Sequence, residues 1–439
     1  MSNSQPKIIV LDDDPTGSQT VHSCLLLMQW DVETLRLGLA DGVNIFFILT
    51  NTRALTPEKA AEVTREVCHN LKLALEAENI QDFLVVSRSD STLRGHYPIE
   101  TDVIAEELGK FDAHFLIPAF FEGGRVTRDS IHYPYIDGVA IPVHETEFAK
   151  DSVFGYHHSY LPDYVEEKTK GRIKANEVER FLLNDIRKGT QERLMKLENN
   201  QCGVVDGEIQ ADLDQFAQDI LQATASRKRF LFRSAASILT SLAQLGTQPI
   251  PAEEMAKYKP TNLSGVVIVG SHVKKTTEQL DNLLKEPDTV GLEIDVTRLR
   301  DHPEQRDEIL QETLTKIEQI HQSHQTPVIY TSRQELTFDT VQQRLDFGEA
   351  VSALLMDIVQ NLPKDISFLI SKGGITSNDV LSTGLNLRSA RLVGQILAGC
   401  SMVRTAENHP RFPNLPVVLF PGNVGDAGGL ATVYRRLSR

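Results

Sequence analysis

Three segments in the first third of the chain combine carboxylates, guanidinium groups and hydroxyls. They are DDDPTGS at 12–18, SRSDSTLRGH at 87–96 and PAFFEGGRVT at 118–127. Adjacent carboxylates repel one another and can bind Mg²⁺ or accept a proton from a hydroxyl. Arginine matches a carboxylate or phosphate with two parallel hydrogen bonds. These residue types predict a site for a hydroxylated anion, although each segment alone is also compatible with a structural turn or helix start.

Three further segments, all in the second half, are rich in glycine. They are GSHVKKTT at 270–277, SKGGITS at 371–377 and FPGNVGDAGG at 420–429. Glycine lets a backbone approach phosphate closely, and amides that lead into a helix can bind a nucleotide phosphate. The Walker A pattern and the dinucleotide-binding G-x-G-x-x-G pattern are both absent from these segments. The segments therefore favour phosphate binding by a different kind of loop, or simple structural turns.

Each of the six segments follows a predicted strand. The predicted strands are Lys7–Leu11, Asn44–Leu49, Phe83–Ser87, His114–Pro118, Val266–Val269, Val328–Thr331, Phe368–Ser371 and Val417–Phe420. Continuous apolar runs of this kind are typical of strands buried on both faces of a parallel sheet. Helical patterns lie between them, notably Pro57–Ala77 after the N-cap Thr56 and Asp346–Leu362 with a capping box of Asp346 and Glu349.

The alternation of strands and helices predicts an α/β protein of two domains, each a mostly parallel sheet flanked by helices. A chain of 439 residues is long enough for two such domains. A proline-rich stretch beginning at Gly246 predicts the connector. We expect a substrate domain at 1–245, a linker at 246–261 and a nucleotide domain at 262–439, with the active site in the cleft between the domains. Ligands of open α/β sheets bind at the carboxyl ends of the strands.

Composition excludes several other classes of protein. A net charge of −15 argues against non-specific binding to nucleic acid or to an anionic membrane. The four cysteines form no C-x-x-C pair, the histidines form no metal-ligand pattern, and no G-x-S-x-G motif is present. The N-terminus does not have the pattern of a signal peptide, and no stretch has the length of a membrane span, so we expect a cytoplasmic protein.

Taken in order, the six segments resemble the four-carbon acid-sugar kinase family. The family patterns A-D-D-x-T-G, K-x-D-S-T-L-R-G and P-A-F-x-x-x-G-R-x-T are matched at 13–17, 88–95 and 118–127. In the second half, the S-G-S step is matched in part at 270–271, G-G-E-T-S at 373–377 and the S-G-N-F-G-like loop at 421–425. The departures are Asp12 and Pro15 in the first motif, Arg88 in place of Lys, Ile375 in place of Glu, and His272 and Val273 after Ser271, where small residues or Cys are common.

The resemblance implies an ATP-dependent kinase that phosphorylates a terminal hydroxyl of a sugar acid of the threonate, erythronate or 3-oxo-tetronate type. ATP and Mg²⁺ are the expected cofactors, and the metal ligands are not identified. The candidate catalytic residues are Asp13, Asp90 and Arg94, with Asp90 or Asp13 as the general base. The candidate substrate-binding residues are Asp14, Thr16, Arg88, Ser91 and Arg125. The candidate nucleotide-binding residues are Ser271, Gly373, Gly374, Ile375, Thr376, Gly422 and Asn423.

Two other functions remain open at this point. The first is a non-catalytic ligand-binding or effector protein derived from the kinase fold, which the change to Ile375 favours because it removes a carboxylate from the nucleotide loop. The second is an acid-sugar epimerase or dehydratase that uses the same aspartates and arginines without ATP. A homodimer is compatible with the sequence, and neither nucleic acid nor a membrane is expected as a partner.

Overall fold

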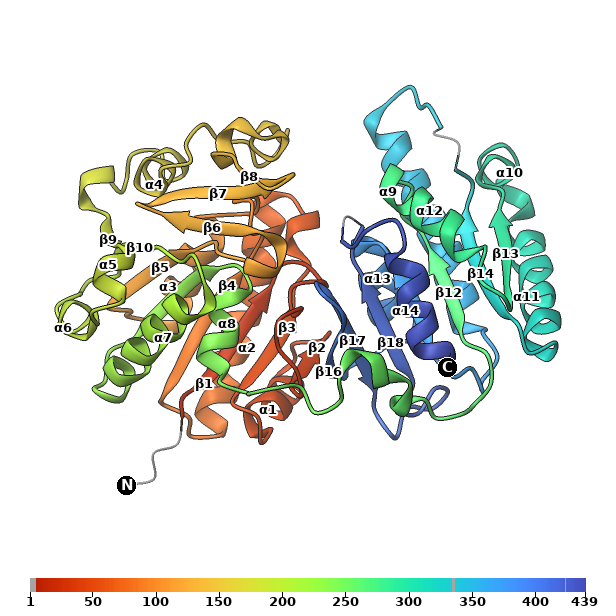
Figure 1. The fold of residues 1–439 in the computed structure, drawn as a ribbon, viewed down its shortest axis with the longest axis horizontal. Coiled ribbons are helices and arrows are strands. Elements are labelled where there is room, and N and C mark those ends of the chain that lie inside the picture. The colour runs from red at the N-terminus through yellow and green to blue at the C-terminus, as the bar shows by residue number, and fades with distance from the viewer. Residues whose placement is uncertain (1–4, 334–335, 423) are drawn as a thin grey trace. The chain divides into compact units, whose positions relative to one another are not determined.

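The computed structural model describes residues 5–333, 336–422 and 424–439. The chain forms two compact units, Met1–Thr247 and Gln248–Arg439. Each unit is built around its own sheet, and each is described by itself below (Figure 1).

The sheet of the first unit is entirely parallel. In spatial order its strands are β2 (Leu25–Leu27), β3 (Ile45–Leu49), β1 (Lys7–Asp12), β4 (Phe83–Arg88), β11 (Phe230–Ser234), β5 (Ala113–Ile117), β10 (Gln201–Val205) and β9 (Glu179–Phe181). All residues of β3, with the sequence IFFIL, are buried, as the continuous apolar run predicts. The carboxyl ends of β1, β4 and β5 carry the three acidic and basic segments, so parallel pairing gathers them at one edge.

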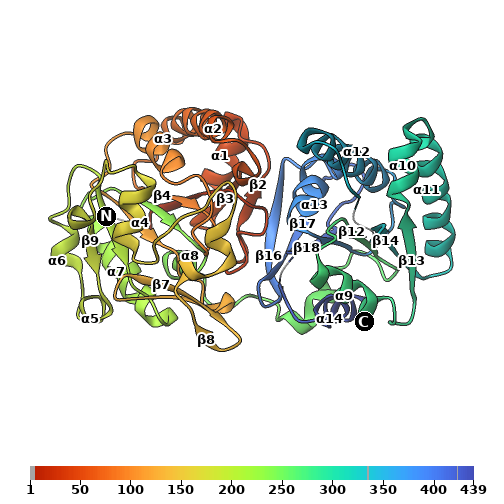
Figure 2. The ribbon, with the colours of Figure 1, turned by 90° about the horizontal axis from the view of Figure 1, so that it is seen from above.

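Helices cover both faces of this sheet (Figure 2). The helices α1 (Val32–Ala40), α2 (Pro57–Ala77) and α3 (Ile99–Leu108) share a buried cluster on one face, and α7 (Gln210–Ala225) and α8 (Ser237–Ala243) lie on the other. Helix α2 has the predicted bounds, and the side chain of Thr56 accepts a hydrogen bond from the backbone N–H of Lys59.

Smaller elements complete the first unit. A hairpin-like sheet consists of β6 (Arg125–Arg128), β7 (Ile131–Ile136) and β8 (Val139–Ala140). The short helices are α4 (Leu161–Lys168), α5 (Leu183–Ile186), α6 (Gln191–Leu194), η1 (Thr52–Ala54), η2 (Phe121–Gly123), η3 (Val143–Glu145), η4 (Glu147–Lys150) and η5 (Ala175–Glu177). Among them, η1 and β6 contribute side chains to the candidate site.

The sheet of the second unit is mostly parallel. Its parallel strands, in spatial order, are β13 (Thr289–Ile294), β14 (Thr326–Thr331), β12 (Val266–Val269), β15 (Leu369–Lys372) and β18 (Pro416–Phe420). Strands β17 (Cys400–Thr405) and β16 (Ser389–Leu397) continue it with antiparallel pairing. The α/β class predicted from the sequence, with a mostly parallel sheet in each unit, is confirmed.

Two helical layers cover this second sheet. The helices α9 (Lys274–Leu283) and α14 (Gly429–Ser438) pack on one face. The others are α10 (Val296–Asp301), α11 (Arg306–Gln322), α12 (Val341–Gln360), α13 (Gly374–Asp379), the π-helix η8 (Val380–Gly384) and the short η7 (Pro303–Gln305). Helix α12 begins five residues before the predicted Asp346, because Thr340 and Gln343 form the capping box that the sequence analysis placed at Asp346 and Glu349.

The predicted connector at 246–261 contains folded structure. It includes the 3-10 helix η6 (Ala252–Tyr258), and the Met255 side chain is fully buried in the core of the second unit. The change of unit therefore falls at Thr247–Gln248. Within the described part of the chain, no helix has both the length and the apolar character that crossing a membrane requires.

Candidate active site

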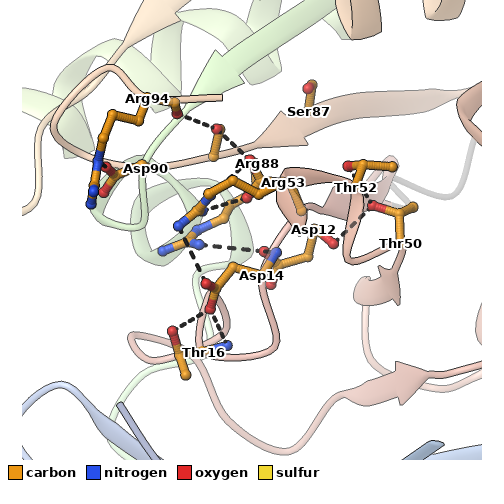
Figure 3. A network of polar contacts seen from close by, with 12 residues as sticks. Asp12, Asp14, Thr16, Thr50, Thr52, Arg53, Ser87, Arg88, Asp90 and Arg94 are labelled. Carbon is orange, nitrogen blue, oxygen red and sulfur yellow. Dashed lines mark hydrogen bonds and ion pairs between the residues drawn. The ribbon is translucent and has the colours of Figure 1, made fainter. Parts of the chain in front are cut away.

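Arg53 joins two of the carboxylates that follow β1 (Figure 3). Its Nη2 lies 2.5 Å from Oδ1 of Asp13, its Nε 3.2 Å from Oδ2 of the same carboxylate, and its Nη1 3.3 Å from Oδ2 of Asp14. Burial alone would lower the pKa of Arg53, but the charges of Asp13 and Asp14 raise it well above its ordinary value. Conversely, the Arg53 charge and hydrogen bonds from Thr16 outweigh burial and lower the pKa of Asp14. Both groups are therefore ionised at neutral pH.

Asp12 lies beneath this pair in a different environment. Its Oδ1 is 3.4 Å from Nη1 of Arg88, whereas its buried Oδ2 has no hydrogen-bond partner in the described part of the chain. Burial raises the pKa of Asp12 to about 7, more than the Arg88 charge lowers it. The sequence expectation of one raised pKa among three adjacent carboxylates thus applies to Asp12, with burial as the main cause.

The loop after β4 is fastened to this cluster by hydroxyls and a second arginine. Ser89 donates a hydrogen bond of 2.5 Å to Oδ2 of Asp13. Arg233, in β11, donates to Ser87 and Ser89 at 2.8 Å each and pairs with the buried Glu100 at 2.5 Å. Gly95 has a φ of 128°, and a Cβ there would lie 2.5 Å from Nη2 of Arg233. The glycine of the D-S-T-L-R-G motif is therefore required by both conformation and space.

Asp90 and Arg94 form an ion pair within the same loop. The Nε of Arg94 lies 2.7 Å from Oδ2 of Asp90, and the Thr92 hydroxyl donates to the same oxygen. Burial would raise the pKa of Asp90, but the charges of Arg53 and Arg94 and the Thr92 hydrogen bond lower it to about 2. Asp90 is therefore a strong hydrogen-bond acceptor and a weak base.

Three aromatic side chains hold the backbone of this loop from outside. The hydroxyls of Tyr156 and Tyr164 donate to the carbonyls of Thr92 and Leu93 at 2.7 and 2.9 Å. The Nε2 of His132 lies 2.7 Å from the Ser91 carbonyl, and burial lowers the pKa of His132 to about 4. A neutral imidazole with its proton on Nε2 satisfies this contact. The predicted substrate-binding residue Ser91 is buried, and the contact to His132 is made by its backbone.

Arg125, at the start of β6, differs from the other arginines of the cluster. Its Nη1 donates to the Gly123 carbonyl, its Nε is buried without a hydrogen-bond partner, and it forms no ion pair within the described residues. Burial lowers its pKa, the charge of Asp90 opposes this effect, and Arg94 reinforces it. Arg125 is thus a half-buried cation whose pKa is shifted by the charges of Asp90 and Arg94. Its guanidinium has N–H groups left to bind an anionic ligand.

The structure brings most of the predicted residues of the first unit into one polar network. Asp13, Asp14, Thr16, Arg88, Asp90 and Arg94 appear together in Figure 3 or in direct contact with residues drawn there. A cavity of about 10 Å³, close to the smallest space that holds one water, is lined by Ser89, Asp90, Arg94, Arg233 and Ser234, among others. The sequence analysis missed several members of the network: Arg53, Glu100, His132, Tyr156, Tyr164 and Arg233.

In the second unit, the three glycine-rich loops lie side by side. The Thr276 hydroxyl is 3.2 Å from Oγ of Ser271 and 3.4 Å from the Gly422 carbonyl. Gly373 has a φ of 122°, and a Cβ there would lie 3.0 Å from Cβ of Ser271. The loops after β12, β15 and β18 therefore meet at one sheet edge. Gly374 begins α13, Ile375 is 70% exposed, and the predicted Asn423 lies outside the described residues.

Two cations lie at this edge in addition to the candidate nucleotide-binding residues. Lys372 ends β15, and its Nζ is 2.5 Å from the Pro421 carbonyl and 3.0 Å from that of Gly422. Arg333, after β14, donates from Nη1 to the Ser271 carbonyl at 2.9 Å. Neither forms an ion pair with a carboxylate in the described ranges, which fits an edge that receives anionic phosphates. No group of three or more His, Cys, Asp or Glu residues in the described ranges could hold a metal ion.

The fold is that of a two-domain α/β protein, with a network of charged and polar side chains at the sheet edge of the first unit and three adjacent glycine-rich loops at the sheet edge of the second. Residues 8–242 match the sequence model of a sugar-binding N-terminal domain, and residues 266–430 match that of a nucleotide-binding C-terminal domain. The chain belongs to the four-carbon acid-sugar kinase family.

One relative agrees with this assignment, and two solved structures share the fold. A D-erythronate kinase from Heliobacterium modesticaldum is 24% identical over 311 residues, which span 67% of this chain and 64% of that enzyme. A protein from Salmonella typhimurium LT2 with the provisional name tRNA synthase has the same fold, with a TM-score of 0.71, 18% identity and 98% of each chain covered. A protein from Haemophilus influenzae gives a TM-score of 0.66 with 17% identity, over 97% of this chain and 98% of that one. At these identities the two solved structures bear on the fold alone.

Proposed function

We propose that this protein is a kinase that transfers the γ-phosphate of ATP to the terminal hydroxyl of a four-carbon sugar acid. The proposal depends mainly on the environment of Arg125. This half-buried guanidinium forms no ion pair within the described residues, and the charges of Asp90 and Arg94 shift its pKa. A cation with capacity for a carboxylate, next to acceptors for hydroxyls, suits a hydroxylated acid. The D-erythronate kinase relative supports the same class of acceptor.

In this proposal, the substrate-binding residues of the first unit have distinct roles. Arg125, assisted by Arg94, binds the carboxylate of the acid through charged hydrogen bonds. Asp14 and Asp90 accept hydrogen bonds from its hydroxyls. Because Asp90 has a pKa of about 2, it is a weak base, and its main role is to orient the acceptor hydroxyl. The hydroxyl then loses its proton late in the reaction, which agrees with the loose transition state of phosphoryl transfer. Arg53 holds Asp13 and Asp14 in place and keeps them charged.

The second unit supplies the nucleotide site. Ser271, Gly373, Thr376 and Gly422 allow the phosphates to approach the backbone, with Lys372 and Arg333 close behind. Mg²⁺ usually keeps several waters and binds through substrate phosphates with one or two carboxylates. The donor set at this edge offers no dedicated cage, so we expect Mg²⁺ to accompany the phosphates. The location of the transfer in a cleft between the domains stays a prediction.

One observation favours a second candidate function, a non-catalytic ligand-binding protein. Ile375 occupies the position of the Glu in the G-G-E-T-S motif and is 70% exposed. A large apolar side chain exposed beside a phosphate site contributes no charge to catalysis. The two functions differ in turnover: a binding protein retains ATP affinity and produces no ADP.

An ADP-coupled assay over a panel of four-carbon sugar acids tests the proposal. The panel contains D- and L-threonate, D- and L-erythronate and the corresponding 3-oxo acid, with glycerate and gluconate as size controls. We expect ADP formation that depends on one of the four-carbon acids and exceeds the rate without acid at least about 10³-fold, well within what enzymes achieve. Nucleotide binding with no acid-dependent ADP across the whole panel would instead establish the binding protein.

A further inference from the structure

Lys372 is a lysine buried at the centre of the phosphate-type edge. Its side chain is fully buried at the carboxyl end of β15, where β12 and β18 flank it. Its Nζ donates to the carbonyls of Pro421 and Gly422 and lies 4.3 Å from the centre of the Phe420 ring. These contacts tie the end of β15 to the loop that follows β18.

The contacts of Lys372 leave its charged form without an anionic partner. Its Nζ donates to two carbonyls, and the third N–H of an ammonium group has the face of the Phe420 ring, 4.3 Å from Nζ, as its neighbour. No carboxylate pairs with Nζ in the described part of the chain. A ring face and two carbonyls compensate a buried positive charge less than a carboxylate does, so an anion bound nearby would stabilise the charged form.

Burial and the charged and titratable groups around Lys372 have the net effect of lowering its pKa. Burial lowers its pKa to about 7, the thiol of Cys400 on β17 raises it, and the charge of Lys275 on α9 lowers it further. Burial raises the pKa of Cys400 above the physiological range, so this thiol is neutral and offers little compensating charge. The flanking strands β12 and β18 contain no titratable residue.

We propose that Lys372 is a positioning residue that holds the loop after β18 and takes up a proton when the phosphates of a nucleotide bind at this edge. The inference rests on the proposed function, because it requires the second unit to bind a nucleotide. An anion a few ångströms away in a poorly solvated site strongly favours the ammonium form. The loop would then be fixed most firmly when the nucleotide is bound.

The proton uptake has a predictable pH dependence. With a pKa of about 7, the free protein holds Lys372 mostly charged near pH 6 and mostly neutral near pH 8. Binding that raises this pKa well above 8 should take up about 0.1 proton per nucleotide at pH 6 and about 0.9 at pH 8.

Calorimetric titration with ADP, in two buffers of different ionisation enthalpy at each of three pH values, measures this uptake directly. We expect the wild-type protein to show uptake that rises from pH 6 to pH 8. Lys372→Met should abolish the rise, whereas Lys364→Met, at an exposed lysine of the same unit, should retain it. Lys372→Arg, whose charge is permanent, should bind ADP without the rise. The wild-type series decides the question even if a Lys372 variant does not fold.

The outcomes separate this inference from the proposed function. ADP binding without pH-dependent uptake in the wild-type protein would overturn the role of Lys372 and leave the kinase proposal standing. A rise in uptake that persists unchanged in Lys372→Met would also overturn it, because the proton would then belong to another group. Absence of any ADP binding would overturn the nucleotide site itself, and the inference with it.

Discussion

Arg88 and Asp12 lie opposite each other in the parallel strands β4 and β1, with Nη1 of Arg88 3.4 Å from Oδ1 of Asp12. Both side chains are almost completely buried. The sequence patterns of the acid-sugar kinases have Lys and Ala at these two positions. The two departures from the patterns therefore contact each other, so that a buried carboxylate accompanies a larger buried cation at the carboxyl ends of β1 and β4.

Breaking this pair one residue at a time should be costly. Asp12→Ala leaves a buried guanidinium without its carboxylate, and Arg88→Lys loses the planar fork that reaches Asp12. We expect the double variant to be destabilised by less than the sum of the two single variants, with a coupling free energy of about 0.5–3 kcal/mol. Urea unfolding at a fixed pH measures all four proteins of the cycle.

The exposed pair of Arg227 and Asp82 in the same unit is the control for this cycle. Its side chains are 74% and 57% exposed, so Arg227→Ala should change the unfolding free energy little. Additive effects of Asp12→Ala and Arg88→Lys would show that the two residues are not coupled.

Arg125 should determine affinity for the acid. Arg125→Ala removes the cation proposed for the carboxylate and should lower kcat/KM for the acid about 10- to 150-fold, the equivalent of roughly 1.5–3 kcal/mol. Arg125→Lys should lower it almost as much if the contact is bidentate. KM for ATP should not change.

Arg128 provides the matched control for Arg125. It lies in the same strand, β6, but its side chain is 50% exposed and pairs with Glu208. Arg128→Ala should therefore retain wild-type kinetics. Equal kinetics for Arg125→Ala and Arg128→Ala would remove Arg125 from the site.

The two units should separate acid binding from nucleotide binding. Asp90→Asn keeps the shape of the side chain but weakens its hydrogen bonds to a hydroxyl, so turnover should be lost while ATP affinity is retained. Gly373→Ala strains a backbone with a φ of 122° and places a Cβ against Ser271, so ATP affinity should fall while binding of the acid is retained. Calorimetric titration of each variant with each ligand makes the comparison.

Two substitutions at similar positions control for general damage. Asp102→Asn alters an exposed carboxylate on α3 that pairs with Arg172, and Gly348→Ala adds a methyl group in open space on α12. Both should bind both ligands as the wild-type protein does. Loss of ATP in Asp90→Asn together with loss of the acid in Gly373→Ala would reverse the assignment of the two units.

His132 should make the protein sensitive to acid. Its pKa is about 4 in the folded protein, below the value of about 6.5 for an unfolded histidine. Between these values the unfolded chain binds a proton that the folded protein excludes, so stability rises with pH and is lost as pH falls from about 6.5 to about 4. As pH falls from 7 to 4, the unfolding free energy of the wild-type protein should therefore decrease by up to about 3 kcal/mol more than that of His132→Gln.

The difference between variant and wild type is the informative quantity for His132. Burial raises the pKa values of Asp12 and Asp206 to about 7 and about 6, and these groups change stability in the opposite sense over the same range. They contribute equally to both proteins and cancel. Parallel curves for His132→Gln and the wild-type protein would contradict the prediction.

Local patterns in the sequence were sufficient for much of the fold. Every predicted strand is present, because runs such as IFFIL at 45–49 are apolar throughout and end in polar residues. Helix α2 has the predicted bounds, since Thr56 and Pro57 together specify its start. For α12 two capping boxes were available in the sequence, and the structure uses the earlier one, at Thr340.

The missed residues of the site depend on contacts between distant parts of the chain. Arg233 pairs with Glu100, 133 positions away, and no local pattern reveals that partner. The charged residue within the apolar run FLFRS was the available sign that β11 must satisfy a buried cation. Arg53 follows the predicted strand at 44–49, so the rule applied to the other strand ends would have selected it. The hydrogen bonds of Tyr156, Tyr164 and His132 to the loop go to backbone carbonyls, which every residue type carries, so the loop sequence does not reveal these partners.

Phosphorus-31 NMR of a reaction containing ATP, Mg²⁺ and D-erythronate tests the central claim most directly. We predict that the γ-phosphate signal of ATP is replaced, in equal amounts, by the signals of ADP and of a phosphomonoester coupled to a methylene group, as phosphorylation of the terminal hydroxyl requires. If the panel assay identifies another four-carbon acid, that acid replaces D-erythronate. Release of inorganic phosphate without an ester, or an ATP spectrum unchanged by every four-carbon acid, would contradict the account.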